Sequence, residues 1–292
     1  MRNLKENLLE LIRKTSTELP ADIVRAIEQG MDKEQVGSQA YHALEIIRKN
    51  IDLAQGHSQP LCQDTGAILF YVEAPKGFDQ ILFEREARKA VVTATKKGYL
   101  RQNSVDSITG HNSGNNLGPG TPVFHFHQAT RKDVSVKLVL KGGGCENVGA
   151  QYSLPDTRLQ ADRDLEGVKK CILDAVVQAQ GKGCGPGILG VTIGGDRSTG
   201  YSYSKEQFLR SLTDVNPNAV LARIEEEMLK KANELGIGPM GFGGKTTLLS
   251  CKVGVLNRLP ASYFVTVSYM CWAFRRQGFV ITSQGKIKKW LY

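Results

Sequence analysis

Glycine clusters at the ends of short apolar runs are the feature that most restricts how this chain can fold. Clusters such as "TGHNSGNNLGPGTP", "KGGGCEN", "GKGCGPG" and "GIGPMGFGGKTT" border or separate runs such as "AILFYVE", "ILGVTIG" and "YFVTVSYM". Glycine occupies 31 of the 292 positions, which exceeds the usual share of about 7%. Because glycine has no Cβ, its concentration at predicted strand ends indicates either backbone that must approach another group closely or a set of tight turns.

Hydrophobic periodicity divides the chain near residue 55. Before it, apolar residues recur at three- and four-residue intervals, as in "NLKENLLELIRK" and "ADIVRAIEQG", which predicts helices. After it, we expect strands at 67–73, 122–128, 134–140, 188–194, 248–256 and 263–270, and helices near 82–97, 162–180, 204–213 and 219–235. The expected fold is α/β of the α+β type: a helical N-terminal lead-in, then mixed β-sheet layers flanked by helices. We expect 1–55 to pack on 56–292, which would form one continuous catalytic domain.

Composition restricts the class of protein. The 41% hydrophobic and 23% charged content is that of an ordinary globular protein. No run approaches the roughly 18 apolar residues of a membrane helix, and the first residues lack a signal-peptide apolar core. We therefore expect a cytoplasmic protein that does not bind membranes.

The net charge of +9 is compatible with binding to nucleic acid, to an acidic partner or to an anionic substrate. Because no nucleic-acid-binding motif accompanies it, we expect most of this charge to be a solvated surface.

The six cysteines differ in their local sequence. In a reducing cytosol each is expected to be a thiol and not half of a disulfide. Cys171 and Cys251 lie on apolar stripes of a predicted helix and strand, so we expect these two, the core cysteines, to be buried. Cys62, Cys184 and Cys271 each lie where a run meets a break, which makes them candidate metal ligands, while Cys145 is undecided. Their separations are too long for a local zinc or ferredoxin signature.

The stretch "PMGFGGKTT" resembles a phosphate-binding P-loop only superficially. A P-loop requires glycine six positions before its lysine, but Pro239 stands six positions before Lys245. The preceding segment also has a helical pattern where a strand is required. Nucleotide binding is therefore not expected, although successive glycine amides can bind a smaller anion beside Lys245.

Several motifs in order carry a family resemblance. They are "PLCQDTG", "GYLRQNS", "KGGGCEN", "CGPGILGVTIGG", "LGIGPMGFGGKTT" and "CWAFRR". Together, over roughly residues 40–280, they resemble the alpha subunit, or N-terminal half, of the class I iron–sulfur fumarate hydratase and tartrate dehydratase family. The resemblance implies that Cys62, Cys184 and Cys271, the ligand cysteines, hold a [4Fe–4S] cluster whose fourth iron has no protein thiolate. The family usually has serine at Cys145, so this thiol is expected to lie in a substrate-facing loop.

The resemblance also implies roles for residues beside these cysteines. Asp64 is expected to be catalytic, as an acid/base group or a substrate-contacting carboxylate, with a turn aspartate as the alternative. Substrate binding is expected from Gln63, Arg101, Gly142, Gly143, Gly144, Asn115 and Lys245. For Asn115 a turn-forming role is an equal alternative. His125 and His127 alternate with phenylalanines, which favours an ordinary polar strand face. Arg275 and Arg276 are candidates for contact with an acidic substrate or a partner subunit.

The function implied is reversible hydration of fumarate to malate, a step of the tricarboxylic acid cycle. The sequence ends at Tyr292, whereas single-chain members of the family continue into a second domain. The resemblance therefore implies a separate beta subunit, an active site at the junction and a heterotetramer. One alternative is the alpha subunit of L-tartrate dehydratase, which shares the same motifs. An alternative of another class is a basic, zinc-containing nucleic-acid-binding protein.

Overall fold

The computed structural model describes residues 3–292 and groups them into two compact units. Unit 1 comprises the described residues up to Ala21, together with Lys49–Gly143 and Ala273–Tyr292. Unit 2 comprises Asp22–Arg48 and Gly144–Trp272. Each unit has its own cluster of buried apolar side chains. These boundaries differ from the division at residue 55, and the packing of 1–55 on 56–292 as one continuous catalytic domain stays a prediction.

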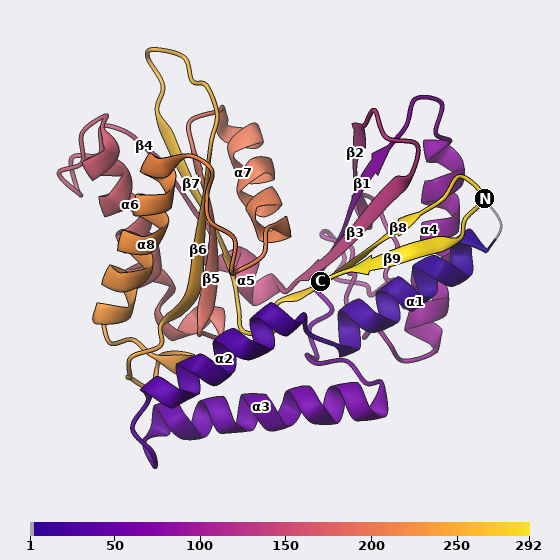
Figure 1. Ribbon diagram of the computed structural model, residues 1–292, viewed down its shortest axis with the longest axis horizontal. Coiled ribbons are helices and arrows are strands. Elements are labelled where there is room, and N and C mark those ends of the chain that lie inside the picture. Colours follow the sequence, from indigo (N-terminus) through magenta and orange to yellow (C-terminus); the bar gives the residue numbers. More distant parts are fainter. Residues whose placement is uncertain (1–2) are drawn as a thin grey trace. The chain divides into compact units, whose positions relative to one another are not determined.

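Unit 1 is built on a five-stranded sheet in the order β2-β1-β3-β8-β9. Its strands are β1 (Ala67–Ala74), β2 (Val123–Gln128), β3 (Val134–Lys141), β8 (Arg275–Ile281) and β9 (Ile287–Leu291). Only β1 and β2 are parallel, so the other neighbours run antiparallel. Helices α1 (Leu4–Thr17) and α4 (Gln80–Lys96) pack on each other beside this sheet (Figure 1).

The two helices of unit 1 follow from their sequences. Helix α1 buries Leu4, Leu8, Leu11 and Ile12, whose spacing puts them on one face of a helix. Asp79 caps α4, because its side chain accepts a hydrogen bond from the backbone N–H of Leu82 at 2.8 Å. The buried faces of both helices join the apolar side chains of β1, β3 and β8 in one core.

Unit 2 is built on a four-stranded sheet in the order β4-β7-β5-β6. Its strands are β4 (Ala150–Ser153), β5 (Gly187–Ile193), β6 (Leu248–Val255) and β7 (Phe264–Met270). Helices α6 (Leu165–Ala179) and α8 (Ala219–Glu234) cover one face, and α7 (Arg197–Glu206) covers the other (Figure 1). Helix α2 (Ala21–Lys33) lies almost wholly in unit 2, and α3 (Gln39–His57) begins there.

Strand direction in unit 2 determines which loops meet. Strand β5 is parallel to β6 and antiparallel to β7, with Ile188 opposite Met270. The beginning of β5 and the end of β7 therefore lie at one edge of the sheet, whereas the ends of β5 and β6 lie at the opposite edge. Cys184 precedes β5 and Cys271 follows β7, so both belong to the first edge.

The expected fold class is confirmed, since helices flank mixed sheets. All six predicted strands and the three N-terminal helices are present. The helix predicted at 204–213 is wrong, because α7 spans Arg197–Glu206 and is followed by the short 3-10 helix η2 (Gln207–Leu209). The helix starts early because Asp196 accepts hydrogen bonds from the backbone of Ser198 and Thr199 in a capping box.

The segment "KGGGCEN" was expected to be a loop but contains the short helix α5 (Gly143–Asn147).

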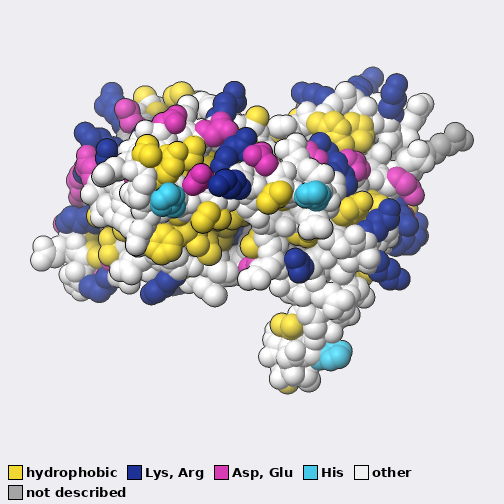
Figure 2. Space-filling view, turned by 90° about the horizontal axis from the view of Figure 1, so that it is seen from below, with side chains coloured by type: hydrophobic (Ala, Val, Ile, Leu, Met, Phe, Trp, Pro, Cys, Tyr) yellow, Lys and Arg dark blue, Asp and Glu magenta, His cyan; other side chains and the backbone are white. Residues whose placement is uncertain are grey.

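On the face of the molecule shown in Figure 2, Lys and Arg side chains are scattered among Asp and Glu. That distribution agrees with a solvated, mixed-charge surface on this face. Within residues 3–292, no helix is both long and apolar enough to cross a membrane.

Candidate active site

Asp64 lies half-buried in unit 1, in the loop that precedes β1. Its Oδ1 accepts a hydrogen bond from Asn103 Nδ2 at 2.8 Å, and its Oδ2 accepts one from the backbone N–H of Gly143 at 2.6 Å. A turn aspartate accepts from backbone two or three residues later. Asp64 instead bonds to residues 39 and 79 positions away. Three segments of unit 1 therefore orient this carboxylate.

Two glycines allow these segments to approach each other. Gly66 has a φ of 75°, and a Cβ added there would lie 2.2 Å from the carbonyl oxygen of Lys141. A Cβ at Gly142 would lie 3.1 Å from Asp64 Oδ2. A side chain at Gly66 would push the loop of Asp64 away from the end of β3, and one at Gly142 would crowd the Asp64 carboxylate. Close backbone approach, one of the two interpretations of the glycine clusters, applies at this point.

The backbone of Arg101 is fixed beside the Asp64 loop. Its carbonyl oxygen accepts hydrogen bonds from Thr65 Oγ1 and Asn116 Nδ2, each at 2.8 Å. The side chains of Arg101 and Gln63 are exposed. Arg101 also borders a cavity of about 560 Å³ lined by residues 57–60 and 97–101. Unit 1 thus brings Cys62, Gln63, Asp64 and Arg101 into one region of its surface.

Other predicted substrate-binding residues have structural hydrogen bonds. Asn115 Oδ1 accepts from the backbone N–H of Leu117 at 2.9 Å, as expected for its turn-forming alternative. The N–H of Lys245, in unit 2, donates to both carboxylate oxygens of Glu34, at 2.9 and 3.0 Å. The Lys245 side chain is exposed, as is Gly144 in the first turn of α5. A substrate-binding role for Asn115, Gly144 and Lys245 stays a prediction.

Cys184 and Cys271 meet at one edge of the unit 2 sheet. The backbone N–H of Trp272 donates to the carbonyl oxygen of Cys184 at 3.4 Å. Cys184 has a φ of 53° after the 3-10 helix η1 (Gln180–Gly183) and is exposed, whereas Cys271 is 7% exposed. Neither forms a disulfide. Segments 87 positions apart in sequence therefore place two predicted ligands side by side.

Tyr269 lies under this edge. A Cβ at Gly183 would lie 2.4 Å from its ring, and one at Gly187 would lie 2.3 Å from its ring and hydroxyl. The glycines around Cys184 therefore allow the loop to pack on a buried phenol. Burial raises the pKa of Tyr269, and the negative charges of Cys271, Cys145 and Cys184 as thiolates raise it further. The charges of three cysteines of unit 2 therefore act on one buried hydroxyl.

The core cysteines are confirmed as interior residues. Cys171 and Cys251 are 0% and 2% exposed in the core of unit 2. Burial raises the pKa of each thiol to about 12. Such thiols stay protonated at neutral pH, which makes them poor metal ligands and nucleophiles.

The donor set suits an iron–sulfur cluster in its chemistry, since thiolates are the ligands of such clusters. Cys184 and Cys271 lie in unit 2 and Cys62 lies in unit 1. Within the described chain, no three or more His, Cys, Asp and Glu side chains form a group that could hold a metal ion. That Cys62, Cys184 and Cys271 together hold a cluster stays a prediction.

The histidine pair agrees with the strand-face interpretation. The half-buried ring of His125 stacks on Tyr71 of the neighbouring strand, with centroids 4.6 Å apart and an interplanar angle of 10°. His127 is exposed two positions further along β2.

Asn103 was not predicted as a site residue, although it lies in the quoted motif "GYLRQNS" two positions after Arg101.

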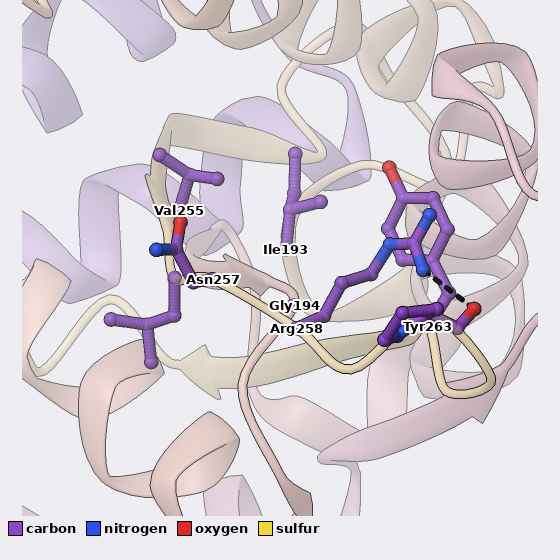
Figure 3. Close-up of a pocket in the computed structure, with 8 residues that line it drawn as sticks. Ile193, Gly194, Val255, Asn257, Arg258 and Tyr263 are labelled. Carbon is purple, nitrogen blue, oxygen red and sulfur yellow. Dashed lines mark hydrogen bonds between the residues drawn. The ribbon is translucent and has the colours of Figure 1, made fainter.

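A cavity of about 550 Å³ lies at the opposite edge of the unit 2 sheet. Figure 3 shows Arg258 beside Tyr263 there, and its guanidinium carbon lies 4.5 Å from the ring centroid. Arg258 Nη1 also donates to carbonyl oxygens of its own loop. Strand β5, which rises about 3.3 Å per residue, separates this cavity from Cys184 by roughly 20 Å. The cavity is therefore not part of the cysteine edge.

The chain matches the family described as fumarate hydratase (Fumerase) over residues 5–280. A candidate class I fumarate hydratase of Geobacillus stearothermophilus is 52% identical over 296 aligned positions, which cover 100% of this chain and 58% of that protein. The chain therefore spans little more than half the length of that relative.

Two further relatives are similar in length to this chain. A candidate L(+)-tartrate dehydratase subunit alpha of Methanocaldococcus jannaschii is 30% identical over 278 positions, covering 94% of this chain and 95% of that protein. The L(+)-tartrate dehydratase subunit alpha of Escherichia coli is 30% identical over 282 positions, covering 94% and 90%.

Proposed function

The chain belongs to the fumarate hydratase (Fumerase) family, and from that membership we propose that it is the alpha subunit of a [4Fe–4S]-dependent hydro-lyase that hydrates fumarate reversibly to malate. The observation that carries the proposal is the sheet edge where Cys184 and Cys271 lie together, neither in a disulfide. Similarity over its whole length to a candidate class I fumarate hydratase supports the same activity.

In this proposal Cys62, Cys184 and Cys271 hold the cluster. When bound, the cluster supplies an iron without a protein thiolate, which acts as a Lewis acid toward substrate oxygens. Cys62 is half-buried and Cys184 is exposed, so neither residue lies in the interior of its unit. The core cysteines have no part in it, because they lie inside unit 2.

Asp64 is proposed to move the proton that hydration adds and dehydration removes. Each of its carboxylate oxygens accepts one hydrogen bond from the protein, from Asn103 or Gly143. Each oxygen therefore keeps a further lone pair for a proton. Because both donors fix the carboxylate plane, its orientation is set before the substrate arrives, which lowers the entropic cost of proton transfer.

Arg101 and Gln63 are proposed to bind the substrate. The Arg101 guanidinium offers a planar pair of N–H donors to a carboxylate, and the Gln63 amide donates to a single oxygen. Both side chains are exposed beside Asp64, so they are available to a ligand. Gly142, Gly143, Gly144, Asn115 and Lys245 are proposed to add further donors.

A separate beta subunit is proposed to complete the active site, in a heterotetramer in the cytoplasm. The chain spans 58% of the Geobacillus protein but 95% and 90% of two proteins named as alpha subunits. These proportions support a chain that functions with a second polypeptide. The proposed metabolic role is the fumarate–malate step of the tricarboxylic acid cycle.

L-tartrate dehydration is the second candidate, because the two relatives of matching length carry that name. The test is to purify the chain anaerobically with its beta subunit and to assay fumarate, malate and L-tartrate separately. Turnover of fumarate and malate supports the proposal. Turnover of L-tartrate alone would replace it with the second candidate.

A further inference from the structure

Arg275 is a buried cation with two guanidinium nitrogens that lack a hydrogen-bond partner among residues 3–292. It begins β8 and is 1% exposed. In the part of the chain that the structure describes, its Nε and Nη1 atoms have no partner. Buried guanidinium groups are almost always paired, because an unpaired charge in the interior is costly. The arrangement therefore indicates acceptors supplied from outside this chain.

The guanidinium lies beside Asp64. Arg275 is opposite Leu140 in the pairing of β8 with β3, so it is close to Gly142, two positions further along. A Cβ at Gly142 would lie 3.8 Å from Arg275 Nη2 and 3.1 Å from Asp64 Oδ2. The cation and the carboxylate thus flank the same glycine.

The protein itself does not satisfy this cation. Among residues 3–292, no ion pair or hydrogen bond joins Asp64 to Arg275, and the donors to the Asp64 carboxylate are Asn103 and Gly143. The neighbouring Arg276 is 0% exposed, but its guanidinium lies 4.7 Å from the ring centroid of Phe274 and 4.5 Å from that of Tyr292. Two aromatic rings therefore contact Arg276. No comparable contact is present for Arg275 among residues 3–292.

We propose that Arg275 binds one carboxylate group of a small dicarboxylate in the space beside Gly142. A carboxylate supplies two acceptor oxygens in the plane that a guanidinium fork requires. Gly143 and Gln63, which adjoin Gly142 and Asp64 in the chain, are exposed to solvent. The choice of a dicarboxylate rests on the proposed function, and the inference adds the residue that grips one end of the substrate.

The test is thermal unfolding of the full chain with sodium malonate, against sodium chloride at equal ionic strength. Malonate has no hydroxyl group and no carbon–carbon double bond, so its binding is measured independently of hydratase activity. At tenfold excess over its Kd, malonate should raise the Tm of the wild type by about 2–5 °C. Arg275→Met should abolish that rise. Arg276→Met, the matched control, should keep it.

A second readout distinguishes binding from a structural role. Without malonate, Arg275→Met should unfold no more readily than the wild type, because methionine removes an unpaired buried charge. An equal malonate shift in Arg275→Met and wild type, or no shift in the wild type, overturns the inference. If Arg275→Met does not fold, calorimetry on Arg275→Lys decides: malonate affinity at least tenfold weaker supports the inference, and unchanged affinity overturns it.

The outcome is separable from that of the proposed function. Malonate binding through Arg275, combined with no hydration of fumarate by the two-subunit enzyme, would remove the function and leave the anion site. Active enzyme combined with malonate binding that is insensitive to Arg275→Met would remove only the anion site.

Discussion

Replacing Gly66 with alanine should destabilise unit 1 because the new methyl group would collide with backbone. Gly66 has a φ of 75°, and the Cβ would lie 2.2 Å from the carbonyl oxygen of Lys141 and 2.6 Å from the nitrogen of Gly142. Contacts of a real Cβ below 3.0 Å essentially never occur. The loop must therefore move away from β3, and the hydrogen bond between Asp64 and Gly143 is lost with it.

The magnitude follows from two costs. The left-handed conformation costs alanine about 1 kcal/mol. Moving the loop loses the Asp64–Gly143 hydrogen bond and the end of the β1–β3 pairing, which together contribute about 2–3 kcal/mol. The expected loss is about 3–4 kcal/mol. The control is Gly77→Ala in the same unit, since Gly77 has a φ of 82° but no atom within 4 Å of an added Cβ. It should cost only about 1 kcal/mol.

Urea unfolding followed by tryptophan fluorescence measures this difference. Trp290 packs edge-on against Phe279 in unit 1, at a centroid distance of 5.6 Å. In a Trp272→Phe background it is the only tryptophan, because the chain has two. Amide exchange at Gly143 should also accelerate in Gly66→Ala and not in Gly77→Ala. Equal losses of stability in the two variants would refute the reasoning, since conformation alone would then explain both.

Three further outcomes are expected. Serine at any ligand cysteine should abolish iron binding. Serine at either core cysteine should leave the iron content intact and lower the free energy of unfolding by about 1–3 kcal/mol. Normal iron content in Cys184→Ser would contradict the assignment. Asp64→Asn should retain iron and lower turnover by roughly 10²–10⁴, and near-normal turnover would exclude proton transfer by Asp64. The hydrogen bond from Arg158 lowers the pKa of Asp174 below its ordinary value of 3.8. The loss of stability in Arg158→Gln, measured by urea unfolding, should therefore be largest above pH 3.8 and become smaller below it. A loss of stability that does not depend on pH would contradict this linkage.

Strands with strong apolar patterns were predictable from the sequence. The runs "AILFYVE" and "YFVTVSYM" became β1 and β7 because their side chains are buried in the unit cores. Strands β8 and β9 were missed, because "RRQG" and "IKKW" are rich in polar residues. Their β conformation depends on pairing with β3 and with each other, which is tertiary information.

The site was predictable in its parts but not in its hydrogen bonds. The core cysteines could be separated from the others because their neighbours have helical or alternating apolar patterns. Asn103 and Tyr269 were not identified, since their contacts come from segments far apart in sequence. The burial of Arg275 was equally hidden, because a charged residue at the start of a strand is normally solvated.

The iron, inorganic sulfide and zinc content of the anaerobically purified chain tests the central claim most directly. A cluster held by the ligand cysteines predicts roughly four irons and four sulfides per chain, with brown colour and little zinc. Iron and inorganic sulfide should be lost together in Cys62→Ser, Cys184→Ser and Cys271→Ser. Stoichiometric zinc in a colourless protein without sulfide would contradict the account and favour the zinc-containing alternative.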